Sequence, residues 1–128
     1  MTDKQMKALL YAQQGELDAV AMYNALAKKA KDTKDAATFK QLASEEGRHA
    51  SVFHAYTGRV LKPKKTKAVA LPILYSLLGR KRLYPLIAKG EYDAEKKYEA
   101  LVHDFEEVKT VQADEHRHGD TVLALLKK

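Results

Sequence analysis

The hexapeptide Ser44-Glu45-Glu46-Gly47-Arg48-His49 has a related copy near the C-terminus, Ala113-Asp114-Glu115-His116-Arg117-His118. Each copy places a glutamate and a histidine three residues apart. This spacing is about one turn of an α-helix, so both side chains lie on the same helical face. In each copy these two residues occupy positions that apolar residues take in the surrounding sequence. The pattern predicts two helices, each directing a carboxylate and an imidazole towards the protein interior.

Apolar residues recur at steps of three and four in four long segments, 6–27, 39–56, 84–101 and 108–125. This spacing is typical of helices with one buried face, and no strand-like alternation competes with it. A turn at 32–35, which also supplies an N-cap, and a short break near His103-Asp104 separate the members of each pair. The sequence therefore predicts two antiparallel helical hairpins.

A long connection, 59–83, joins the hairpins after Gly58, which is expected to end the second helix. Its apolar part, 68–78, predicts a short extra helix that packs across the bundle and is closed by Gly79. We interpret the basic residues of the run 62–67 and of 80–82 as solvated linker; the alternative is a docking patch for nucleic acid or an electron donor. Four helices joined by a short, a long and a short connection predict an all-α, ferritin-like four-helix bundle, formed as a single domain over residues 1–128.

Charged or polar residues interrupt each apolar stripe. They are Glu16, Glu46 with His49, Glu91, and Glu115 with His118. Burying an isolated carboxylate costs several kcal/mol, and a domain has a total stability of only about 5–15 kcal/mol. The stripes contain no Lys or Arg, so the compensating charge must come from outside the chain, and two divalent cations would supply it. Oxygen-rich ligation with two imidazoles favours iron or manganese over structural zinc.

An internal repeat supports this interpretation, because the pattern Gly-Glu-x-Asp-Ala-x-x-x-Tyr occurs at both 15–23 and 90–98. The chain therefore reads as two copies of one helical hairpin. Gly15 and Gly90 fall inside predicted helices, where glycine costs about 1 kcal/mol relative to alanine. One interpretation is that these glycines have no structural role and are merely tolerated. The alternative is that they make room beside the metals or permit a π-bulge.

With these residues in place, nearly the whole chain resembles the di-iron domain of the rubrerythrins, within the ferritin-like superfamily. The resemblance implies that Glu46 and Glu115 bridge two irons and that Glu16 and Glu91 are terminal carboxylates. It implies that His49 and His118 each serve one metal, and that Tyr23 and Tyr98 orient the carboxylates by hydrogen bonding. Two iron ions are the expected cofactors, with manganese or a mixed pair as the alternative.

Two features depart from the family pattern. The sequence has no cysteine, whereas rubrerythrins typically carry a C-terminal rubredoxin domain with Cys-ligated iron, so electrons are expected from another protein. Rubrerythrins also usually have a further glutamate three residues after the third-helix ligand, and here that residue is Ala94. Glu95 points about 100° away on the helix and is a poor substitute. The peroxidase mechanism therefore has less support than the metal site.

The resemblance implies a di-iron oxidoreductase, commonly a homodimer, that reduces hydrogen peroxide or dioxygen with electrons from an external donor protein. The alternative is ferroxidation, iron handling or iron sensing; a third reading is a bundle with a purely structural metal pair. His116, His54 and His103 are expected at the surface or at a helix end. The net charge of +6 is too diffuse to indicate nucleic acid, and no such partner is expected.

Neither the first residues of the sequence nor its most apolar part predicts a secretory signal or a membrane-spanning segment. The first residues, Met1-Thr2-Asp3-Lys4-Gln5, lack the apolar stretch of a secretory signal. The most apolar window, 68–78, contains Pro72 and is far shorter than the ~20 residues that span a bilayer. A cytoplasmic protein without a membrane partner is therefore expected.

Overall fold

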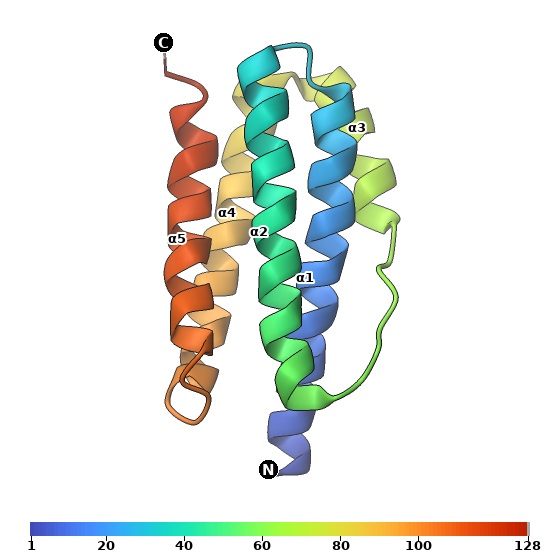
Figure 1. The fold of residues 1–128 in the computed structure, drawn as a ribbon. Helices are drawn as coiled ribbons and strands as arrows, with labels where there is room; N and C mark the ends of the chain where they lie inside the picture. Colours follow the sequence, from blue (N-terminus) through green and yellow to red (C-terminus); the bar gives the residue numbers. More distant parts are fainter. Residues whose placement is uncertain (128) are drawn as a thin grey trace. The chain divides into compact units, whose positions relative to one another are not determined.

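The computed structural model describes residues 1–127 of the chain, and in them all regular secondary structure is helical. The helices are α1 (Asp3–Lys29), α2 (Thr33–Thr57), α3 (Thr66–Leu78), α4 (Arg80–Val102) and α5 (Val108–Ala124) (Figure 1). The predicted all-α class is confirmed. The chain divides into two compact units, Met1–Ile73 and Leu74–Lys128. The last residue of the second unit, residue 128, lies outside the described part. The single domain expected over 1–128 stays a prediction.

The N-terminal unit, Met1–Ile73, is built on the antiparallel hairpin of α1 and α2 (Figure 1). Local caps fix the ends of both helices. Thr2 forms a capping box with Gln5 at the start of α1, and the Asp32 side chain accepts hydrogen bonds from the first backbone amides of α2. Gly58 ends α2 with a φ of 65°, a left-handed conformation that glycine adopts without strain. The N-cap at Asp32 and the C-cap at Gly58 predicted from the sequence are therefore confirmed. The turn lies at residues 30–32 rather than 32–35, because residues 33–35 already form the start of α2.

The C-terminal unit, Leu74–Lys128, is built on the hairpin of α4 and α5 (Figure 1). The sequence interpretation extended the connection to residue 83, but α4 begins directly after Gly79. The reason is that Leu83 and Tyr84 are fully buried in the first turns of α4. Arg80 is not a solvated linker residue either, because its guanidinium donates to the Leu125 carbonyl at 2.7 Å and lies over the Tyr84 ring.

The predicted extra helix is present as α3, which starts two residues earlier than expected. Although it is strongly apolar, none of its side chains is buried. Val69, Ile73 and Leu77 follow one another at intervals of four residues and are 56–75% exposed. The expectation that this helix packs across the bundle stays a prediction.

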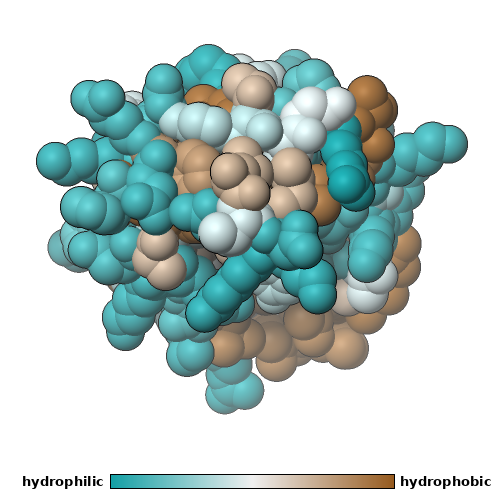
Figure 2. Space-filling model, turned by 90° about the horizontal axis from the view of Figure 1, so that it is seen from below, coloured by the Kyte–Doolittle hydropathy of each residue, from teal (hydrophilic) through white to brown (hydrophobic). Residues whose placement is uncertain are grey.

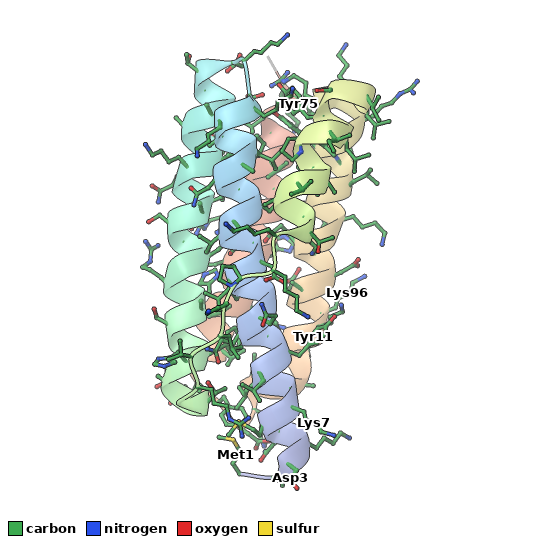
Figure 3. All side chains as sticks on the ribbon, turned by 90° about the vertical axis from the view of Figure 1, so that its right-hand side faces the viewer. Met1, Asp3, Lys7, Tyr11, Tyr75 and Lys96 are labelled. Atoms are coloured by element: carbon green, nitrogen blue, oxygen red, sulfur yellow. The ribbon has the colours of Figure 1, made fainter. Side chains whose placement is uncertain are left out.

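The face drawn in Figure 2 is mostly hydrophilic, with apolar patches among its side chains. Along α1, Asp3, Lys7 and Tyr11 recur every four residues and are all exposed (Figure 3). No helix within residues 1–127 combines the length and the apolar character needed to cross a lipid bilayer.

Candidate metal centre

A first group of three potential metal ligands lies between α1 and α2. Glu16 comes from α1, while Glu46 and His49 lie one turn apart on α2. All three are at most 3% exposed. The His49 Nδ1 atom lies 3.0 Å from Glu16 Oε1 and 3.0 Å from Glu46 Oε1. We call these residues the first triad; one ligand atom from each lies within 4.8 Å of the others.

A second triad lies between α4 and α5, with Glu91 on α4 and with Glu115 and His118 one turn apart on α5. Their exposed fractions are 6%, 2% and 0%. The His118 Nδ1 atom lies 3.4 Å from Glu91 Oε2 and 3.8 Å from Glu115 Oε1. The 3.8 Å separation is too long for a hydrogen bond. The histidine therefore lies farther from its two carboxylates in the second triad than in the first.

The donor set of each triad fits a divalent cation. Two ionised carboxylates and one neutral imidazole give a local charge of −2, and carboxylates held this close and away from water repel each other strongly. Three buried atoms of the second triad, Glu91 Oε2, Glu115 Oε1 and His118 Nδ1, form no hydrogen bond. Oxygen and imidazole-nitrogen donors suit iron and manganese. The chemistry of both triads therefore matches a metal site.

The six residues predicted as ligands thus fall into two sets of three, one within each hairpin, and every one of them is buried. Tyr23 and Tyr98 are also buried. Tyr23 stacks on Phe39 with ring centroids 5.9 Å apart, so it contributes to packing inside the first hairpin. The hydrogen bonding of the two tyrosines to ligand carboxylates stays a prediction.

Some buried polar groups gave no signal in the sequence. Glu45, next to a predicted ligand, is only 5% exposed, and its Oε2 accepts a hydrogen bond from Gln41 Nε2 at 2.9 Å. Gln13 is 2% exposed and bonds to both Thr57 Oγ1 and the Arg59 carbonyl. Glu45 lies one position off the apolar stripe, so periodicity alone predicts an exposed side chain.

His116, which lies between two predicted ligands, points away from them. Its Nδ1 lies 2.9 Å from Glu95 Oε1 and its Nε2 lies 3.4 Å from Asp120 Oδ2 at the surface. The Tyr92 hydroxyl donates to the other oxygen of Asp120 at 2.5 Å. This hydrogen bond is the main reason why the pKa of Tyr92 is raised to about 12. The surface position expected for His116 is confirmed, and so are the exposed positions of His54 and His103.

We expect the pKa of His116 to lie above its ordinary value in the folded protein, because the Glu95 carboxylate accepts a hydrogen bond from the imidazolium and attracts its charge. Since the pKa is raised on folding, the ion pair stabilises the protein below the ordinary histidine pKa. This stabilisation is lost as the pH rises through the raised pKa. An NMR titration of the His116 ring should show the shift, and Glu95→Gln should reduce it. An unchanged titration curve in Glu95→Gln would contradict the assignment.

The glycine that makes room in the structure is one that the sequence did not single out. A Cβ at Gly15 or Gly90 would meet nothing within 4 Å, so neither glycine clears space beside the ligands, and both lie in regular α-helix. At Gly119, directly after His118, a Cβ would lie 2.5–2.9 Å from three ring atoms of Tyr92. Gly119 is therefore required for the close packing of α5 against the Tyr92 ring.

Replacing Gly119 by alanine should destabilise the protein by about 1–3 kcal/mol, the usual cost of overpacking. The Tyr92 ring cannot move away cheaply because its hydroxyl is hydrogen bonded to Asp120. The matched variant Gly90→Ala should instead stabilise the protein by about 0.5–1 kcal/mol, since it adds a helix-favouring residue in open space. Urea unfolding of the two variants checks both signs; equal effects would contradict the packing argument.

The comparisons with known proteins agree with this architecture. The family model described as Rubrerythrin matches residues 7–126, which is nearly the whole chain. No curated protein and no solved structure gives a significant match. The helices and the family match define an all-α, ferritin-like helical bundle protein with a buried Glu/His site for metal. The chain belongs to the rubrerythrin family.

Proposed function

We propose that the two triads together hold a pair of iron ions and that the protein reduces hydrogen peroxide, or dioxygen, with electrons from an external donor protein. The observation that carries the proposal is the presence, in a rubrerythrin-family chain, of one buried Glu plus Glu-x-x-His triad in each hairpin. Their combined charge of −4 matches two divalent cations. The proposal includes the cytoplasmic location expected from the sequence.

The proposed roles of the residues are those that the resemblance to rubrerythrins implies. Glu46 and Glu115 would bridge the metals, Glu16 and Glu91 would each bind one, and His49 and His118 would add one nitrogen donor per metal. When bound, iron would supply the electrons that reduce the peroxide. The chain holds the ligands in a buried site, which excludes bulk water from the reacting oxygen atoms. The overall reaction, H₂O₂ with two electrons and two protons, yields two water molecules.

One observation favours the alternative, in which Fe²⁺ is itself the substrate or signal. Rubrerythrins usually have a glutamate at the position of Ala94, and the carboxylate of the adjacent Glu95 is bound to His116 at the surface. Glu95 therefore does not replace the missing ligand. Peroxide reduction as in rubrerythrins loses support without this carboxylate, whereas iron oxidation or sensing requires only the six ligands that are present.

Stopped-flow oxidation of the anaerobically Fe²⁺-loaded protein separates these functions. We expect peroxide to oxidise the irons faster than dioxygen, with the product remaining bound and a chemical reductant restoring the starting state. Faster oxidation by dioxygen, with ferric iron released or stored, would instead establish the iron-handling alternative. Glu16→Ala should abolish the fast phase. Glu45→Ala, which removes a buried carboxylate that is not a predicted ligand, should retain it.

A further inference from the structure

The net positive charge of the protein comes from one of its two units. Residues 1–73 contain 13 Lys and Arg against seven Asp and Glu, whereas residues 74–128 contain ten of each kind. The whole formal charge of +6 therefore belongs to the N-terminal unit. Four of its seven acidic residues are buried, namely Glu16, Asp35, Glu45 and Glu46. The surface of this unit is consequently more basic than its composition suggests.

Much of this charge lies on the segment 59–67, which leads from α2 into α3. Five of its residues are basic and all five are exposed: Arg59, Lys62, Lys64, Lys65 and Lys67. The backbone of the segment is fastened to α1. Gln13 Nε2 donates to the Arg59 carbonyl at 2.7 Å, and Gln14 Nε2 donates to the Lys62 carbonyl at 2.8 Å. The Lys64 amide donates to Asp18 Oδ1 at 2.6 Å. The lysines are therefore displayed from a backbone that is held in place.

A shallow groove of about 220 Å³ lies between this segment and the first hairpin. Its lining is mainly apolar, and includes Leu17, Ala50, Val60 and Leu61 with Ser51 and His54. Val60 is 87% exposed at its edge. Three of the residues that line the groove directly follow a ligand of the first triad in sequence. Leu17 follows Glu16, Gly47 follows Glu46 and Ala50 follows His49. The groove thus lies on the same two helices that carry the first triad, and these three lining residues are about 100° around their helices from the ligands.

We propose that the groove and the exposed basic residues of segment 59–67 form the docking site of an acidic electron-donor protein. The proposal rests on the proposed function, because that function requires two electrons from outside the chain for each peroxide. An apolar groove rimmed by like charges is typical of a protein interface, in which the rim steers a partner of opposite charge. Segment 59–67 contains no aromatic side chain on which bases could stack, so an acidic protein fits this surface better than nucleic acid does.

The test measures the binding of the iron-loaded protein to rubredoxin, a small acidic one-electron carrier, by calorimetry at low salt and at about 500 mM salt, where charges are strongly screened. We expect binding at low salt that salt weakens. The double variant Lys62→Glu/Lys65→Glu should weaken it by at least about tenfold. The matched control Lys31→Glu/Lys34→Glu makes the same change of charge at the other end of α2 and should bind within about twofold of the wild type. Val60→Ser, at a highly exposed position, should weaken binding with no change of charge.

A second readout separates this proposal from the proposed function. The rate at which peroxide oxidises the reduced irons should be the same in all variants, and so should the rate at which dithionite reduces the oxidised irons. The rate of reduction by rubredoxin should fall only in the variants of the docking surface. If peroxide does not oxidise the irons of the wild type, the proposed function is contradicted, while the binding measurement still tests the docking site. Equal binding by both double variants, no binding at low salt, or tighter binding of duplex DNA than of rubredoxin would overturn the docking site.

Discussion

Replacing Glu46 by alanine should abolish the binding of two iron ions per chain, and Glu115→Ala should do the same. The resemblance to rubrerythrins gives these two carboxylates a bridging role, so removal of either one takes a ligand from both metals at once. The substitution also lowers the negative charge of the site and so weakens its attraction for divalent cations. Anaerobic titration with Fe²⁺, followed by measurement of bound iron after gel filtration, gives the stoichiometry directly.

The control for this experiment is Glu45→Ala. Glu45 is adjacent to Glu46 and also buried, but its carboxylate bonds to Gln41 within α2. The Glu45→Ala variant should therefore retain two irons. Loss of one iron in Glu46→Ala and of the other in Glu115→Ala would show that each hairpin binds its own ion independently. Full retention of both irons would contradict the assignment of the ligands altogether.

Removal of the metal should lower the stability of the protein by several kcal/mol. Two divalent ions neutralise the charge of −4 that the four ligand glutamates carry in buried positions, and the unfolded chain offers no comparable site. At a free metal concentration about a thousandfold above the dissociation constant, a single site contributes about 4 kcal/mol. Urea unfolding with saturating Mn²⁺, which avoids oxidation, and then with a chelator measures the difference.

Variants show whether this stabilisation arises at the triads. In Glu46→Ala the unfolding midpoint should be the same with and without metal, whereas Glu45→Ala should keep the full metal-dependent increase. An equal response of the two variants would mean that the metal stabilises the protein from some other location, such as exposed carboxylates at the surface.

Local rules predicted much of the fold because they depend on few neighbouring residues. Asp32 and Gly58 mark helix ends by hydrogen bonding and by φ, which act within a single turn. The start of α4 was missed because the burial of Leu83 and the bond from Arg80 to Leu125 join residues far apart in the sequence. The apolar composition of α3 likewise suggested burial, yet none of its side chains is buried.

The candidate site was predictable for a different reason. A glutamate and a histidine one turn apart on an apolar stripe are costly without a ligand, so Glu46 with His49 and Glu115 with His118 are visible in the sequence alone. The burial of Glu45 and the contact of Gly119 with the Tyr92 ring were not visible. Both depend on how side chains of different turns or helices meet, and no spacing rule encodes this.

The absence of buried side chains in α3 also determines where the native chain opens first. A helix without a fully buried side chain unfolds locally at little cost, and Pro72 removes one of the hydrogen bonds of α3. Amide protons of α3 should exchange with solvent well before those of α2 or α5, and a protease should nick the chain there. Because both triads lie outside α3, such a cut would leave each hairpin with all three of its ligands on one polypeptide. Expressed as separate fragments, the two halves would then be candidates for reassembly into a split metalloprotein.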